Sequence, residues 1–134
     1  NALTKTQRLG GVSIITDTIV PKHNFRIYLE KVHERLNKSK IEYLLFGHLG
    51  DCHLHFHLIP NNKQEKESLE IYDYLIDLSL KLDGVYSAEH GTGKRKTNDF
   101  KKCYGVKAVE MVKKLKNTID PNNYLNRGNL ISYN

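Results

Sequence analysis

Residues 43–60 have the sequence Tyr43-Leu-Leu-Phe-Gly-His-Leu-Gly-Asp-Cys-His-Leu-His-Phe-His-Leu-Ile-Pro60, which predicts a β-hairpin. Polar and apolar residues alternate along its second half, and a proline ends the run, as is typical of a strand. We expect strands at about 41–48 and 52–59. Gly50 and Asp51 are expected to form a two-residue loop between them.

Four of the seven histidines of the chain lie in this hairpin. Side chains on a strand alternate between faces, and directly opposed residues of a hairpin share a face. The imidazoles predicted on one face are His48, His53, His55 and His57. Imidazole is the commonest side-chain ligand of transition metals and a base near neutral pH. Four on one face therefore favour a metal or catalytic site over a solvated polar surface.

The remaining pattern predicts an α+β fold. The expected order is strand, helix, two strands, helix and strand, at residues 11–20, 24–38, 41–48, 52–59, 69–80 and 85–87. This βαββαβ order is that of the ferredoxin-like antiparallel sheet, with both helices on one face. We also expect a C-terminal helix at 99–118 and an extended tail at 122–134. The histidine face would then be open, so another domain or subunit is expected to cover it.

Composition indicates one soluble domain in 134 residues with a net charge of +6. From Gly91 onward, ten Lys or Arg residues stand against three acidic ones, but aromatic residues are not interleaved with them, which does not favour a nucleic-acid partner. No apolar run approaches the roughly 20 residues of a transmembrane helix. Cys52 and Cys103 are expected to be free thiols in a reducing, cytoplasmic compartment. The start at Asn1 indicates a piece of a longer protein.

A second chemical segment, Ser87-Ala-Glu-His-Gly-Thr-Gly-Lys94, follows the last predicted strand. Its glycines allow the backbone to approach a ligand closely, and a carboxylate beside an imidazole can divide metal binding from proton transfer. A phosphate-binding loop is excluded, because Ala88 and Arg95 stand where that motif needs Gly and Ser or Thr.

These segments together resemble the C-terminal domain of FAD-linked oxidases, the flavoproteins that include D-lactate dehydrogenase, glycolate oxidase and D-2-hydroxyglutarate dehydrogenase. The hairpin is similar to the family's Gly-His-x-Gly-Asp-Gly-Asn-x-His, and the second segment to its Gly-Glu-His-Gly-Ile-Gly. Asp120-Pro-Asn-Asn-Tyr-Leu-Asn-Arg-Gly128 resembles Asp-Pro-x-x-x-Leu-Asn-Pro-Gly, and Thr16–Pro21 resembles an Asp-x-x-x-Pro element. Cys52 and His53 depart from the family's Gly-Asn, as Arg127 does from its Pro.

The resemblance implies a role for six residues. A divalent metal, usually zinc, would be bound by three of them, a fourth would be the catalytic base, a fifth would face the substrate and a sixth the flavin cofactor. In that order these residues are His48, His55 and Glu89; His90; His57; and Asn126.

The resemblance also implies the larger protein. Residues 1–134 would be the C-terminal part of the substrate (cap) domain, and a separate flavin-binding domain, absent from this chain, would hold most of the FAD. The substrate would be a small anionic D-2-hydroxy acid, and an electron acceptor would be a further partner, in the cytoplasm or at the surface of a membrane electron-transfer chain. Two alternatives remain open at this point: a stand-alone metal-dependent hydrolase that uses the same ligands, and a basic binding module around Lys94–Lys116.

Overall fold

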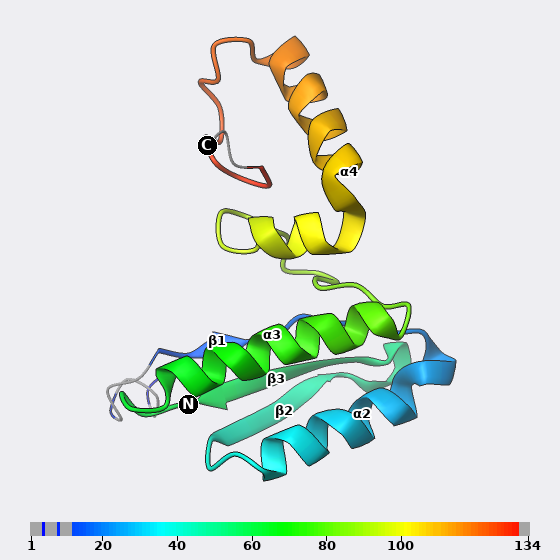
Figure 1. The fold of residues 1–134 in the computed structure, drawn as a ribbon, viewed down its shortest axis with the longest axis vertical. Helices are drawn as coiled ribbons and strands as arrows, with labels where there is room; N and C mark the ends of the chain where they lie inside the picture. Colours follow the sequence, from blue (N-terminus) through cyan, green and yellow to red (C-terminus); the bar gives the residue numbers. More distant parts are fainter. Residues whose placement is uncertain (1–3, 5–7, 9–11, 132–134) are drawn as a thin grey trace. The chain divides into compact units, whose positions relative to one another are not determined.

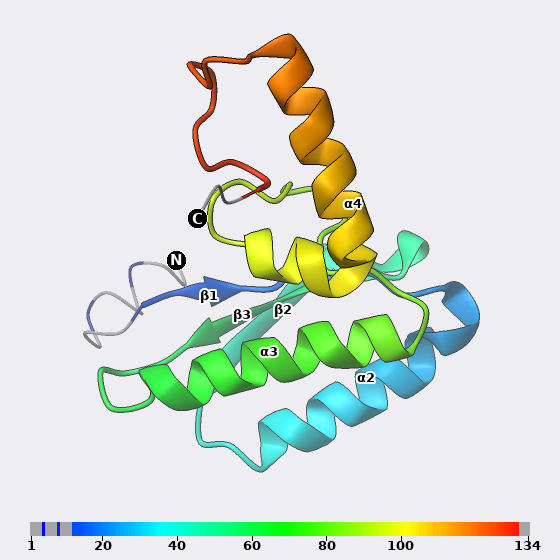
Figure 2. The same ribbon diagram turned by 45° about the horizontal axis from the view of Figure 1, so that its top comes forward.

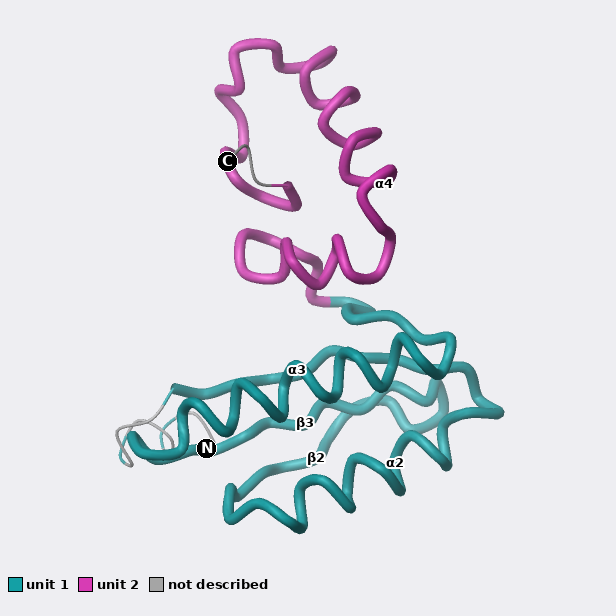
Figure 3. The backbone as a smooth tube through the Cα atoms, viewed as in Figure 1, with its two compact units in different colours: residues 1–89 teal, residues 90–134 magenta. Residues whose placement is uncertain are grey.

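The computed structural model describes residues 4, 8 and 12–131. Gly11, where the first strand was expected to begin, and residues 132–134 of the expected tail lie outside this range. The chain divides into two compact units, unit 1 (Asn1–Glu89) and unit 2 (His90–Asn134), coloured separately in Figure 3. Each unit is described by itself.

Unit 1 is built on a three-stranded antiparallel sheet (Figure 1). Its strands are β1 (Ile14–Ile15), β2 (Glu42–His48) and β3 (His53–Ile59), in the order β1-β3-β2. The predicted hairpin register is confirmed, because His48 pairs with His53 and Phe46 with His55. The predicted two-residue loop is wrong: a 3₁₀ turn, Leu49–Asp51, is followed by Cys52 in the left-handed conformation with φ of 57°. Both loops are centred between Gly50 and Asp51, so the register is the same.

Two helices, α2 (Lys22–Asn37) and α3 (Glu65–Lys81), cover the same face of this sheet (Figure 2). Their buried residues recur at helical spacing, as in an amphipathic helix packed on a sheet. They pack against the apolar face of β3, where Phe56 and Leu58 are fully buried. The core residues that the helices contribute include Tyr28, Val32, Leu36, Ile71, Leu75 and Leu78.

The α+β class and the packing of both helices on one face are as predicted, but two strands are shorter than expected. The first strand reduces to β1, and the predicted fourth strand at 85–87 forms only isolated bridges. Ile19 pairs with Val85 in the antiparallel sense, whereas Asp17 pairs with Ser87 in the parallel sense. Because the direction of pairing changes between the two bridges, a continuous ladder of hydrogen bonds does not form there.

Unit 2 contains α4 (Thr97–Ile119) and a terminal segment. The predicted single helix at 99–118 is interrupted at Gly105, whose φ of 78° and ψ of 174° are not helical. The expected extended tail is also wrong for the described residues, because turns follow Asp120. The N–H of Leu130 donates a hydrogen bond to the carbonyl of Gly93, with 2.7 Å between nitrogen and oxygen.

The described helices include none that is both long enough and apolar enough to cross a membrane. Cys52 and Cys103 are free thiols, as predicted.

Candidate metal centre

The strand β3 places His53, His55 and His57 on the face opposite the helices, as its alternation predicts. The expectation that this face is open is wrong for these three rings, which are only 4–5% exposed. The segment from Ser13 to Asp17 gives each of these imidazoles a hydrogen-bond partner within unit 1.

These partners differ in kind along the segment. The hydroxyl of Ser13 is hydrogen-bonded to Nε2 of His57, and the carbonyl of Thr16 to Nδ1 of His55 at 3.0 Å. Burial lowers the pKa of His57, which favours its neutral form. The neighbouring strand adds Phe46, whose ring lies 5.4 Å from that of His55 between centroids.

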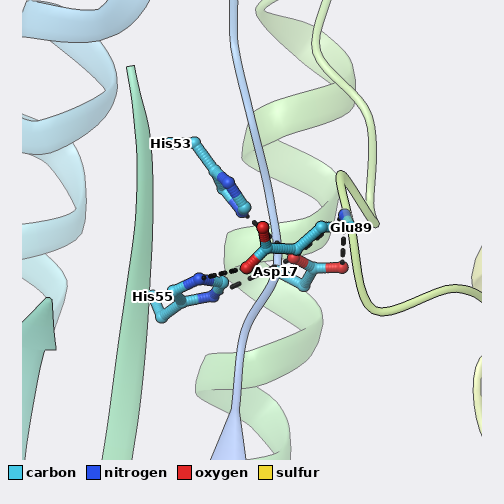
Figure 4. Close-up of side chains that lie close together, drawn as sticks. All are labelled: Asp17, His53, His55 and Glu89. Carbon is cyan, nitrogen blue, oxygen red and sulfur yellow. Dashed lines mark hydrogen bonds and ion pairs between the residues drawn. The ribbon is translucent and has the colours of Figure 1, made fainter. Parts of the chain in front are cut away.

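Asp17 is a fully buried carboxylate at the centre of the site (Figure 4). Its Oδ1 accepts a hydrogen bond from Nε2 of His53 at 3.0 Å, and its Oδ2 accepts one from the hydroxyl of Ser87. A buried carboxylate is costly unless it is hydrogen-bonded, and both oxygens of Asp17 accept a hydrogen bond.

Glu89 approaches the histidines from the end of unit 1. Its Oε1 lies 3.1 Å from Nε2 of His55, and its Oε2 lies 3.8 Å from Nε2 of His48. His48 and Glu89 are also the more open groups, because their side chains are 60% and 45% exposed. Glu89, from a distant loop, therefore lies close to one histidine on each strand of the hairpin.

The hydrogen bonding of His55 defines what this point can bind. A carbonyl only accepts hydrogen bonds, so the bond to Thr16 places a proton on Nδ1 of His55 and directs Nε2 toward Glu89. An imidazole lone pair repels a carboxylate at 3.1 Å unless a proton or a metal ion lies between them. Ligating histidines commonly donate their second N–H to a carbonyl in this way.

The spacing of the donor atoms also suits a metal ion. Zinc binds nitrogen and oxygen at roughly 2.0–2.2 Å, so tetrahedral ligand atoms lie about 3.4 Å apart. The distances from Glu89 to the two imidazole nitrogens, 3.1 and 3.8 Å, lie on either side of this value. Asp17, His53, His55 and Glu89 can each offer a ligand atom within 4.8 Å of the others. The residues present therefore fit a divalent cation.

The structure places Glu89 close to both His48 and His55, and it places His57 on the same face of β3. The four residues whose ligand atoms all lie within 4.8 Å of one another include His55 and Glu89 but not His48. His90 is exposed and begins unit 2, directly after Glu89 in the chain. Asn126 lies in a turn of unit 2 with φ of 44°. The roles of these residues as ligands, base, substrate contact and cofactor contact stay predictions.

Sequence reasoning missed two participants. His53 was expected on the histidine face without a role, and Asp17 appeared only as part of a motif. The available signal was an acidic residue between the β-branched residues of the first strand, since a carboxylate in such a buried run needs partners.

Comparison with known families now identifies the chain. The family described as FAD linked oxidases, C-terminal domain, matches residues 2–130. The chain belongs to this family. The curated proteins to which the chain is similar are named after different substrates. The D-lactate dehydrogenase [cytochrome], mitochondrial, of Arabidopsis thaliana is 28% identical over 125 residues, which is 91% of this chain and 22% of that protein.

Two further relatives extend this range. Glycolate oxidase subunit GlcD of Bacillus subtilis is 28% identical over 98% of this chain and 29% of its own length. A probable D-2-hydroxyglutarate dehydrogenase, mitochondrial, of Oryza sativa subsp. indica is 29% identical over 80% of this chain and 20% of its own length. The chain thus spans less than a third of each of these FAD-linked oxidase relatives.

Proposed function

We propose that this chain is the C-terminal part of the substrate domain of a longer FAD-dependent oxidoreductase, which oxidises a small D-2-hydroxy acid. Membership of the family of FAD-linked oxidases supports the flavin dependence. The names of the relatives support a substrate of the lactate, glycolate or 2-hydroxyglutarate type.

The observation that carries this proposal is that the carboxylate of Glu89 lies close to both His48 and His55 in unit 1. We propose that these side chains hold one divalent cation, zinc being the candidate that suits two nitrogens and a carboxylate. Three protein ligands leave coordination positions for a substrate, as in catalytic rather than structural zinc sites. When bound, such a cation supplies Lewis acidity, which lowers the pKa of a coordinated hydroxyl group.

The remaining predicted residues then have complementary tasks. His90 accepts the proton of the substrate hydroxyl as a general base. His57, kept neutral by its burial, contacts the substrate beside the cation. Asn126 contacts the flavin, which supplies the acceptor for the hydride from C2 of the substrate. The buried contacts of His55 and His53 keep their rings oriented while the substrate enters past the more exposed His48 and Glu89.

The test uses the longer protein that contains this chain. Mixed anaerobically with D-lactate, glycolate or D-2-hydroxyglutarate, it should lose its visible flavin absorbance with at least one of them. Glu89→Gln should slow this reduction by about 100-fold or more, since it removes a ligand charge. His23→Gln, an exposed histidine of α2, is the matched control and should reduce at the wild-type rate. A flavin that none of these acids reduces would refute the proposal.

A further inference from the structure

We infer that Asp17 is a positioning residue that fixes Glu89 against His55 before any metal binds. This inference rests on the proposed function, because it assigns a task to a residue beside the proposed ligands. Asp17 is not one of the three proposed ligands. Its proposed role is to hold the segment that contains Glu89.

Asp17 holds that segment through both its main chain and its side chain. Its carbonyl accepts a hydrogen bond from the N–H of Ala88 at 2.8 Å. Its carboxylate accepts hydrogen bonds from the hydroxyl of Ser87 and from the N–H of Glu89, the latter with 3.3 and 3.4 Å to the two oxygens. Three consecutive residues are thus bound to one buried aspartate.

The same carboxylate also contacts two histidines of β3. Oδ1 of Asp17 accepts the hydrogen bond of His53, and it lies 3.9 Å from Nδ1 of His55. Asp17 therefore links the segment at 87–89 to β3, although neither bridge at 17 and 19 extends into a strand there. This side-chain link adds to the main-chain bridges that Ile19 forms with His53 and Val85.

Its surroundings favour positioning over metal ligation. Both carboxylate oxygens of Asp17 already accept hydrogen bonds from donors, and the residue is 0% exposed. Turning Oδ1 toward a cation would take this acceptor away from the buried N–H of His53, at a cost of roughly 1–3 kcal/mol. Glu89, in contrast, has a side chain that is 45% exposed, and its carboxylate already lies 3.1 Å from His55.

The energetic consequence is preorganisation. A loop that is already ordered in the free protein does not lose further conformational freedom when a ligand binds, so the affinity is higher. Outer contacts that orient metal ligands typically contribute 10–100-fold in metal affinity. We therefore expect Asp17 to influence metal affinity by about this factor without contacting the ion.

The experiment compares Asp17→Asn with Thr18→Val in the full chain. Thr18 is the adjacent residue and is equally buried, but its hydroxyl is bonded to Tyr28 in the helix-covered core at 2.7 Å, so its loss weakens the fold without touching the site. The first readout is amide hydrogen exchange of Ala88 and Glu89 without metal. The second is titration with Co²⁺, whose visible spectrum reports the ligand set.

Asp17→Asn should raise the exchange rates of both amides by about 10-fold or more and weaken Co²⁺ binding by about 10–100-fold, with the band positions of the cobalt spectrum unchanged. Thr18→Val should lower the unfolding midpoint while both readouts stay at wild-type values. Ser87→Ala, which removes one donor to Asp17, should show the same changes to a smaller degree and serves if Asp17→Asn does not fold.

Each other result overturns the inference. Unchanged exchange at Glu89 in Asp17→Asn would show that the carboxylate does not hold the segment, and shifted cobalt bands would make Asp17 a ligand. If wild-type protein binds no Co²⁺, the proposed metal site fails, and the inferred effect on metal affinity fails with it. The exchange readout still decides separately whether Asp17 fixes the segment.

Discussion

The carboxylate of Asp120, at the start of the third sequence motif, organises the turn that follows α4. It accepts hydrogen bonds from the N–H groups of Tyr124 and Leu125 at 2.9 and 2.8 Å, and it pairs with the ammonium group of Lys116. The hydrogen bond from Lys116, followed by that from Leu125, holds the pKa of Asp120 at about 2. The aspartate of this Asp-Pro pair thus stabilises the turn after α4 by accepting hydrogen bonds from its main chain.

Lys116→Met should raise the pKa of Asp120 toward its ordinary value of 3.8. The folded-state pKa is below the unfolded one, so the stabilisation by Asp120 is complete above about pH 4 and is lost as the pH falls through about 2. An NMR titration of the carboxyl carbon measures the midpoint. The control is Lys101→Met, an exposed lysine of the same helix. Equal midpoints in both variants would exclude Lys116 as the cause.

At the residue scale, sequence motifs indicated side chains that lie close to Glu89 in the structure. His48, His55 and Glu89 were chosen from motifs, and Glu89 lies within ion-pair distance of each of the two histidines. Their role as metal ligands stays a prediction. Asp17 could not be assigned in this way, because its task depends on a contact 72 residues away along the chain, to Glu89. Local sequence carries no direct record of such a contact.

At the scale of elements, the β2–β3 hairpin depends on a close backbone approach at Gly47. Its φ is 143°, and a Cβ built there would lie 2.5 Å from the carbonyl oxygen of His53. A side chain at Gly47 would therefore force β2 away from β3 at the residue that precedes His48.

Gly47→Ala should lower the free energy of unfolding by roughly 1–3 kcal/mol, because the strands must separate to accept the methyl group. Gly50→Ala in the same hairpin is the control, since a Cβ there meets no atom within 4 Å. Urea unfolding followed by circular dichroism gives both values. Equal stability of the two variants would contradict the close approach.

The two faces of the sheet should respond differently to truncation of an aromatic ring. Phe56 is 0% exposed and packs edge-on against Tyr28 with 6.5 Å between ring centroids. Phe56→Ala should cost roughly 3–5 kcal/mol of unfolding free energy. Phe46 on the neighbouring strand is 48% exposed, and Phe46→Ala should cost about 1 kcal/mol or less. Calorimetry that shows comparable losses would contradict the assignment of the core to the helix-covered face.

The elements themselves were predictable to different extents. Alternation and a central turn determined the register of β2 and β3, and helical spacing indicated α2 and α3. The residues at 85–87 have strand propensity, but the change in pairing direction between Val85 and Ser87 depends on tertiary contacts with residues 17–19. The break in α4 at Gly105 was equally hidden, since an isolated glycine is often tolerated within a helix.

At the scale of the whole molecule, the chain belongs to the FAD-linked oxidase family and has a candidate metal centre in unit 1. The chain spans only 22% of the Arabidopsis D-lactate dehydrogenase to which it is similar, and the flavin reduction that we propose concerns a longer protein. Metal binding, in contrast, requires only side chains of unit 1. It can therefore be tested with the chain itself.

The most direct measurement is the zinc content and affinity of the full chain, determined by metal analysis after dialysis and by calorimetric titration. We expect one Zn²⁺ per chain in the wild type. Binding should weaken by about 100-fold or more in His48→Ala, His55→Ala and Glu89→Gln, and should be unchanged in His23→Gln. A wild-type chain without zinc affinity, or zinc binding that survives all three ligand substitutions, would contradict the convergence of these residues on a single cation.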